Sequence, residues 1–196
     1  MSQPGTEPHR CAMKTPYLKL AILAVGLWIA VGIALAGEPA NLGPHKDELF
    51  AYQKSGEYDR DITTVAAKAR SWLEERAAKR AAGERLIVIF DLDETLLSNW
   101  AQLEAEKFGG TAASWMAWWG SAKCSAIEPV RAVYDAARRL GVEVIFITGR
   151  PERARAPTEQ NLRGIGCGDY AALICKPNDS KDTMEKFKTA FLKVTA

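Results

Sequence analysis

The sequence predicts an α/β fold in which a parallel sheet carries helices on both faces and a small helical insertion. Three apolar runs typical of buried strands lie at residues 86–90, 142–147 and 171–175. Segments with the period of amphipathic helices separate them, and this alternation is typical of parallel strands joined by helical crossovers. With 196 residues, 47% of them hydrophobic, the chain is long enough for one domain with a sizeable core.

Residues 1–36 have the composition of a targeting segment. An apolar stretch at 20–36 follows a basic start and closes with Ala34-Leu35-Ala36, a pattern typical of a secretory signal peptide. We therefore expect a leader at 1–36, cleaved from a mature domain at 37–196, and a secreted or periplasmic location. The alternative is a retained single-span membrane anchor, because the stretch approaches the roughly 20 residues that cross a bilayer.

The first helix of the mature part is expected at 58–82, where apolar side chains recur at helical spacing and Gly83 ends the pattern. The side chains expected on its buried face are Ile62, Val65, Ala66, Ala69, Trp72 and Leu73. The strand at 86–90 follows. Beyond the insertion, the apolar pattern predicts further helices at 129–140, 157–163 and 180–193.

The segment at 98–125 differs from its surroundings in its many aromatic residues and its glycines. We expect it to form the small helical insertion over the edge of the sheet. Trp115, Trp118 and Trp119 recur there at helical spacing. Two interpretations stay open for these side chains: they form a local core, or they offer a stacking platform for a base or an aryl group.

Charge and histidine content exclude several kinds of site. The formal net charge of +2 resides in residues 1–36 and the rest of the chain is neutral, so we expect no nucleic-acid partner. The only histidines are His9 and His45. Two histidines are too few for a histidine-rich metal site. The tripeptide Arg-His-Gly is absent, which excludes a phosphatase that uses the histidine of this tripeptide as its nucleophile.

The mature part contains three cysteines, Cys124, Cys167 and Cys175. Export would bring them into an oxidising compartment, where thiols pair. Cys167 and Cys175 flank a turn and a strand. The sequence leaves open whether these two form a disulfide or stay buried as thiols.

The strand at 86–90 ends in the motif Asp91-Leu92-Asp93-Glu94-Thr95. Because parallel strands deliver their last residues to the ligand-binding edge of the sheet, Asp91 and Asp93 share that edge. Such a pair can attack phosphorus with one carboxylate and handle the leaving group's proton with the other. Mg²⁺ suits an all-oxygen site, and Thr95 is placed to orient Asp93. The alternatives are a helix cap or a calcium loop, although Leu96 replaces the glycine that a calcium loop needs.

Three further positions suit phosphate binding. Thr148 ends the second buried strand, and Gly149 permits close approach of the backbone to a ligand. Arg150 is either a phosphate ligand or one half of a surface ion pair. A fixed ammonium group would stabilise the transferred phosphoryl group. Lys176, directly after the third strand, and Lys188, in the last helix, compete for this role.

Together these residues resemble the haloacid dehalogenase (HAD) superfamily, in particular its subfamily IIIB acid phosphatases. The family's first motif, D-x-D-E-T followed by L-S-N, matches residues 91–99. Its second motif matches Ile147-Thr148-Gly149-Arg150, and its aromatic-Lys-Ser/Thr triplet matches Phe187-Lys188-Thr189. The triplet favours Lys188 over Lys176, and the resemblance extends over residues 41–192.

The resemblance implies a HAD-like sheet and an acid phosphatase that acts on small phosphomonoesters, such as a nucleotide or an aryl phosphate. It implies that Asp91 is the nucleophile and Asp93 the acid/base, and that Mg²⁺ binds the Asp91 carboxylate and the backbone carbonyl of Asp93. Phosphate and substrate would contact four further residues: Thr95, Thr148, Gly149 and Lys188.

The family's fourth motif, Gly-Asp-x-x-x-Asp, does not follow Lys188, because the sequence stops at Ala196. We therefore expect a C-terminally truncated or frame-shifted product that lacks the last strand of the sheet and one metal-binding carboxylate. The alternative function is a catalytically impaired relative that binds ligands or stores nitrogen. A phosphoacceptor signalling domain also orders Asp, Thr and Lys along an α/β chain, but Asp93 and the leader argue against it.

Overall fold

The computed structural model describes residues 41–195 and, for side chains, residues 41–193. The predicted leader and its alternative as a membrane anchor lie outside the described residues. Within residues 41–195, no helix combines the length and the apolar character needed to cross a membrane. From Gly43 onward the described chain forms one compact unit.

The centre of the fold is a three-stranded parallel sheet of β1 (Ile87–Phe90), β4 (Glu143–Pro151) and β5 (Ala172–Lys176). The middle strand, β4, pairs with β1 from Ile87↔Glu143 to Phe90↔Phe146 and with β5 from Ile145↔Ala172 onward. The predicted α/β fold with a parallel sheet is confirmed. β4 continues beyond the predicted 142–147, and its register with β5 shifts between Thr148 and Pro151.

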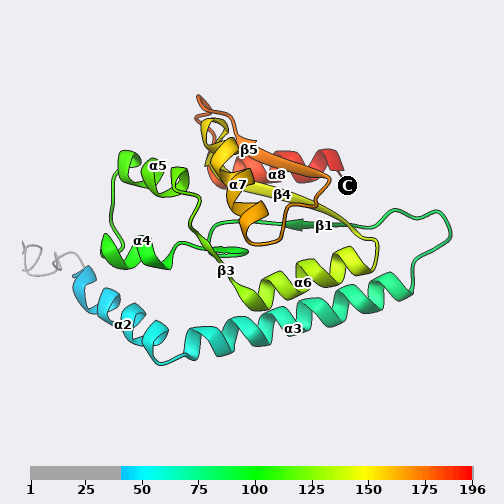
Figure 1. The fold of residues 1–196 in the computed structure, drawn as a ribbon, viewed down its shortest axis with the longest axis horizontal. Coiled ribbons are helices and arrows are strands. Elements are labelled where there is room, and N and C mark those ends of the chain that lie inside the picture. Colours follow the sequence, from blue (N-terminus) through cyan, green and yellow to red (C-terminus); the bar gives the residue numbers. More distant parts are fainter. Residues whose placement is uncertain (1–40, 196) are drawn as a thin grey trace, which may run out of the picture. The chain divides into compact units, whose positions relative to one another are not determined.

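One face of the sheet holds the main hydrophobic core. Val144 and Phe146 of β4 are fully buried there, and α6 (Glu128–Arg139) packs over the strand. The Tyr134 ring of α6 stacks on the Phe146 ring, with 6.1 Å between the ring centroids. The long helix α3 (Glu57–Ala78) runs alongside α6 (Figure 1). Ile145 and Ile147, which point to the opposite face, are also buried, so β4 is covered on both sides.

Only a narrow stripe of α3 is buried. Ala66 and Leu73, seven positions apart, are 5% exposed, whereas Val65 and Trp72 are 64% and 67% exposed. Positions seven apart lie on nearly the same side of a helix, so α6 covers a single line of contacts along α3. The prediction that Val65 and Trp72 are buried is therefore wrong, because the apolar pattern is wider than the stripe that α6 covers.

We expect Phe146→Ala to lower the free energy of unfolding by about 3–5 kcal/mol, the usual range for removing a buried aromatic ring. Trp72→Ala removes a larger ring from an exposed position and should change stability by less than about 0.5 kcal/mol. Urea unfolding of both variants measures the difference. Comparable losses for the two variants would contradict this description of the core.

The predicted insertion is closed by an antiparallel ribbon of β2 (Leu97–Ser98) and β3 (Ser125–Ala126). It contains α4 (Trp100–Ala105) and α5 (Ala112–Gly120), and a capping box of Thr111 and Ser114 begins α5. α5 packs against the short 3₁₀ helix η1 (Glu152–Ala154) and α7 (Arg155–Gly164), both of which directly follow β4. The insertion is thereby anchored beside the end of the central strand.

Two helices depart from the sequence-based expectation. α2 (Leu42–Lys54) was not expected, and it joins α3 through Gly56, whose φ of 72° is the left-handed conformation that glycine adopts readily. The last helix, α8 (Met184–Thr195), begins four residues later than predicted. Residues 177–183 form a loop instead, and the Lys176 ammonium donates to the Asp182 carbonyl at 2.6 Å to hold it.

Candidate active site

The loop after β1 presents the two predicted catalytic carboxylates. Leu92 and Leu96 are fully buried and anchor the loop, whereas the Asp91 and Asp93 side chains are 36% and 26% exposed. A tight turn closes the loop, since the amides of Leu96 and Leu97 both donate to the Leu92 carbonyl. Glu94, within this turn, has a φ of 54°, an uncommon conformation for a residue other than glycine.

Lys188 is the lysine that the fold brings to Asp91. Its ammonium nitrogen lies 2.7 Å from Asp91 Oδ2, while Asp91 Oδ1 accepts from the Leu92 amide at 2.9 Å. The Lys176 ammonium instead donates a hydrogen bond to the Asp182 carbonyl. Of the two lysines that competed for the cationic role, the structure therefore places Lys188 beside the predicted nucleophile.

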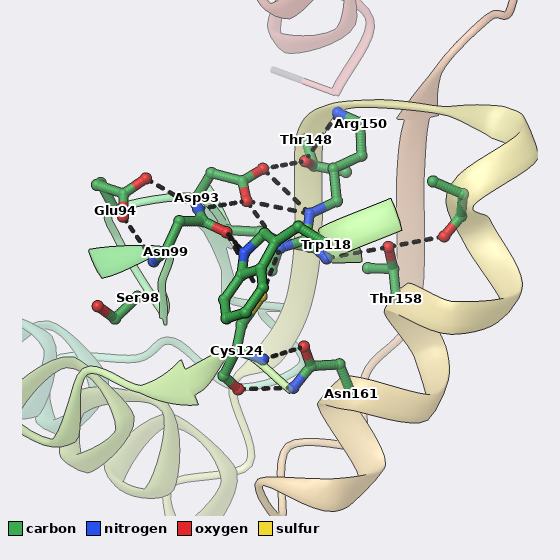
Figure 2. A network of polar contacts seen from close by, with 12 residues as sticks. Asp93, Glu94, Ser98, Asn99, Trp118, Cys124, Thr148, Arg150, Thr158 and Asn161 are labelled. Atoms are coloured by element: carbon green, nitrogen blue, oxygen red, sulfur yellow. Dashed lines mark hydrogen bonds and ion pairs between the residues drawn. The ribbon is translucent and has the colours of Figure 1, made fainter. Parts of the chain in front are cut away.

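Arg150 holds the carboxylate of Asp93 (Figure 2). Its Nη2 and Nε donate to Asp93 Oδ1 at 2.7 and 3.0 Å, and Nε also lies 3.2 Å from Oδ2. The Arg150 side chain is 0% exposed. Neither interpretation offered for Arg150 from the sequence, a phosphate ligand or a surface ion pair, is right, because the guanidinium is buried beneath Asp93.

The surroundings of Arg150 satisfy the rest of its guanidinium group. Nη1 donates to the Thr158 hydroxyl at 3.3 Å, Nη2 contacts the Cys124 sulfur at 3.5 Å, and the Trp119 ring lies 5.6 Å away. Burial alone would lower the pKa of Arg150, but its hydrogen bonds and charge attraction to Asp93 outweigh this and raise the pKa above its ordinary value. Arg150 is thus a fixed cation of the site.

Asn99 provides the second contact to Asp93. Its Nδ2 donates to Asp93 Oδ1 and to Glu94 Oε2, both at 2.9 Å, and its backbone amide donates to Glu94 Oε1 at 2.7 Å. The Asn99 side-chain oxygen accepts from the indole N–H of Trp118 at 2.8 Å. Asn99 is fully buried, so it links the insertion to Asp93.

Thr95 does not orient Asp93 as expected. The carboxylate of Asp93 accepts from Arg150 and Asn99, and the Thr148 hydroxyl lies 3.3 Å from its Oδ2. Thr95 takes part in the turn through its backbone amide, which donates to the Leu92 carbonyl at 3.2 Å. Thr148 lies fully buried in the second half of β4, and its hydroxyl also accepts from the Arg150 amide at 3.1 Å.

Two tryptophans of α5, Trp118 and Trp119, contact residues that surround Asp93. Trp118 bonds to Asn99, Trp119 lies beside Arg150, and Trp115 contacts the Trp119 ring at a centroid distance of 5.8 Å. Other aromatic side chains line a cavity of about 220 Å³ that reaches Glu94. It is lined chiefly by Leu49, Tyr52, Tyr58, Trp100, Leu103 and Phe108.

The three described cysteines are buried and free, so Cys167 and Cys175 do not form a disulfide. Burial raises the pKa of Cys167 and of Cys175 to about 11. Cys124 stands apart because it belongs to the network around Asp93, and Asn161 bonds to both its backbone amide and its carbonyl. Within residues 41–193, no three His, Cys, Asp or Glu side chains gather as a metal site.

Gly149 is in contact with α8. A Cβ atom at this position would lie 2.5 Å from Met184 Sδ, and Met184 lies one helical turn before Lys188. We expect Gly149→Ala to push the Met184 side chain aside and to lower the free energy of unfolding by about 1 kcal/mol, the lower end of the usual cost of overpacking, because a flexible side chain can move.

The double variant Gly149→Ala/Met184→Ala tests this explanation, because the smaller side chain makes room for the new methyl group. Recovery of the free energy of unfolding, measured by urea unfolding, is the expected result. A double variant as destabilised as Gly149→Ala alone would show that the contact with α8 is not the reason for glycine.

Comparison with known proteins identifies the family. The model of the HAD superfamily, subfamily IIIB (acid phosphatase), matches residues 39–194. The chain belongs to this family. The chain is also similar to vegetative storage protein 1 of Arabidopsis thaliana, 28% identical over 155 residues, which cover 77% of this chain and 56% of that protein. Acid phosphatase 1 of Solanum lycopersicum is 28% identical over 152 residues, 72% of this chain and 59% of that protein.

The chain therefore spans a little more than half the length of these two relatives. A solved structure supports the fold. The class C acid phosphatase from Bacillus anthracis superposes with a TM-score of 0.62 at 20% identity, over 76% of this chain and 64% of that one. The predicted resemblance to subfamily IIIB is confirmed.

Proposed function

We propose that the protein is a phosphomonoesterase that works through a phosphorylated Asp91. One observation carries the proposal: Asp91, at the end of β1, pairs with Lys188 and lies two residues from a carboxylate that a buried arginine holds in place. Membership of subfamily IIIB supports the same reaction. Because the chain spans only part of the length of its relatives, the proposal is tested by measuring hydrolysis with this chain.

The first step transfers the phosphoryl group to the enzyme. Asp91 attacks phosphorus, the bond between phosphorus and the leaving oxygen breaks, and Asp93 gives that oxygen a proton. In the second step Asp93 takes a proton from water, the resulting oxygen attacks phosphorus, and the bond to Asp91 breaks. Phosphate leaves, and both carboxyl groups return to their starting states.

Phosphate binding is assigned to the residues around these carboxylates. The Lys188 ammonium is placed to attract the phosphoryl oxygens, and the Thr148 hydroxyl and the backbone at Gly149 lie at the same edge of the sheet. Thr95 stays a prediction as a substrate contact. Preorganised donors of this kind favour a transition state in which negative charge moves onto the phosphoryl oxygens.

The oxygen donors present fit a divalent cation, for which we propose Mg²⁺. The Asp91 carboxylate and the Asp93 backbone carbonyl would hold it, since Mg²⁺ commonly binds one or two carboxylates and completes its shell with water and phosphate oxygens. When bound, the ion would offset negative charge between Asp91 and the incoming phosphate. Titration calorimetry with MgCl₂ on wild type and Asp91→Asn tests the site, and equal binding would exclude Asp91 as a ligand.

For the substrate we propose a small aryl or nucleoside phosphate. The cavity of about 220 Å³ beside Glu94 is lined largely by aromatic and aliphatic side chains, and flat rings stack well on such walls. We also propose that residues 1–36 direct export to a secreted or periplasmic location. Cell fractionation of the full chain and of a chain without residues 1–36 tests the second point.

A second candidate function is a ligand-binding or storage protein with impaired catalysis. The similarity to vegetative storage protein 1 favours it. Hydrolysis of p-nitrophenyl phosphate in the presence of MgCl₂, compared between wild type and Asp91→Asn, decides between the two. Turnover that depends on Asp91 supports the phosphatase. Absence of Asp91-dependent turnover in folded wild-type protein would support the second candidate.

A further inference from the structure

Several side chains of the protein donate hydrogen bonds to the Asp93 carboxylate, more than a solvent-exposed carboxylate usually accepts from its own protein. Its Oδ1 accepts three hydrogen bonds of 2.7–3.0 Å, two from Arg150 and one from Asn99. Its Oδ2 has only longer contacts, at 3.2 Å to Arg150 Nε and 3.3 Å to the Thr148 hydroxyl. The carboxylate is thereby fixed in plane and in rotation, with Oδ1 saturated and Oδ2 the oxygen left for proton transfer.

We infer that Arg150, Asn99 and Trp118 are positioning residues that hold Asp93 Oδ2 toward the leaving oxygen of the substrate. The inference rests on the proposed phosphatase reaction and assigns these three residues a part in its first step. It also assigns the insertion a part in catalysis, because Trp118 lies in α5 while Asp93 follows β1.

Arg150 acts through Asp93 and not on the substrate. Its side chain is 0% exposed, and each of its three nitrogens has a partner within the protein: Asp93, Thr158 or Cys124. A guanidinium fork matches the two oxygens of a carboxylate and fixes their plane, which a lysine ammonium cannot do. The group is therefore suited to orientation and is not available to bind phosphate.

Trp118 determines which end of the Asn99 amide faces Asp93. An indole N–H only donates, so the Asn99 oxygen must turn toward it and the Asn99 NH₂ group toward Asp93 and Glu94. The Cys124 thiol lies 3.4 Å from the same Asn99 oxygen, and burial raises its pKa, which keeps it a neutral S–H donor. A flipped amide would place its NH₂ group against the Trp118 N–H donor and its oxygen against the acceptor oxygens of Asp93 and Glu94, so the orientation seen in Figure 2 is the one that satisfies both sides.

The test compares leaving groups in Trp118→Phe and Arg150→Lys. Trp118→Phe keeps an aromatic ring and loses the N–H, and Arg150→Lys keeps the charge and loses the fork. The value of kcat/KM reports the steps up to formation of the phosphoenzyme. It is measured for p-nitrophenyl phosphate, whose leaving group needs little protonation, and for glycerol 2-phosphate, whose alkoxide needs a proton.

We expect Arg150→Lys to lower kcat/KM about 10–100-fold more for glycerol 2-phosphate than for p-nitrophenyl phosphate, since a general acid contributes about 10²–10⁴-fold. Trp118→Phe should show the same preference at about 3–10-fold, the equivalent of one hydrogen bond. Inhibition by inorganic phosphate should stay within about 2-fold of wild type, because neither residue contacts phosphate. Trp115→Phe, an indole replacement in the same helix, is the matched control and should show no preference.

Equal losses for both substrates, or a parallel loss of inhibition by inorganic phosphate, would overturn the inference while leaving the phosphatase intact. A folded wild-type protein that cleaves neither substrate would overturn the proposed function and the inference with it. If Arg150→Lys unfolds, as circular dichroism would show, the milder Trp118→Phe decides alone.

Discussion

Asp91→Asn should reduce phosphomonoester hydrolysis by about 10⁴-fold or more, the scale of effect seen when an enzyme loses its nucleophile. The amide oxygen is a far weaker nucleophile than the carboxylate, yet it occupies the same space beside Lys188. The measurement is the steady-state rate with p-nitrophenyl phosphate and MgCl₂. The fold should persist, because Asp91 and Lys188 both remain partly exposed.

Asp169→Asn is the matched control for this prediction. Asp169 is a surface carboxylate that pairs with Arg138, away from β1, and its side chain is 75% exposed. Its replacement should leave the rate within about 2-fold of wild type, since exposed ion pairs contribute about 0–1 kcal/mol to stability. Similar rates for Asp91→Asn and wild type would remove Asp91 from the mechanism.

Asp93→Ala should lower the free energy of unfolding by about 3 kcal/mol. The variant leaves the Arg150 guanidinium buried without its counter-charge, and breaking a buried ion pair from one side costs about 3–5 kcal/mol. The lower end of this range applies because the Asp93 side chain is 26% exposed and water can reach part of the site. Urea unfolding measures the change.

Two comparisons make this prediction specific. Asp91→Ala removes a carboxylate from a half-exposed pair and should cost about 1 kcal/mol or less. The double variant Asp93→Ala/Arg150→Met removes both charges and should recover much of the lost stability, as replacement of a whole buried pair by apolar groups often does. A loss below about 1 kcal/mol for Asp93→Ala would mean that Arg150 does not depend on Asp93.

The sequence predicted the sheet well, and it placed the acidic loop after β1 beside Thr148, for a simple reason. The cores of β1, β4 and β5 are short apolar runs followed by polar residues, so Asp91, Asp93 and Thr148 could be placed near one edge, although β4 itself continues to Pro151. The choice of Lys188 over Lys176 came from the resemblance. Periodicity could not make it, because it does not show which of the two ammonium groups reaches Asp91.

Other features depend on tertiary structure and left little local signal. Arg150 lies where the register of β4 with β5 shifts, between Thr148 and Pro151, and its side chain reaches Asp93, 57 positions earlier in the sequence. Asn99 was noted in the sequence only as the last residue of the first motif. Its hydrogen bond with Trp118 joins two residues that are 19 positions apart, which no local pattern indicates. The exposure of Trp72 likewise depends on how little of α3 is covered by α6.

The central claim is that Asp91 becomes phosphorylated during turnover, and rapid-quench mass spectrometry of the digested protein tests it most directly. In protein that cleaves p-nitrophenyl phosphate, the account predicts one phosphoryl group on the peptide that contains Asp91, absent from Asp91→Asn. Active protein that carries the phosphoryl group on another residue, or on none at any quench time, would contradict it.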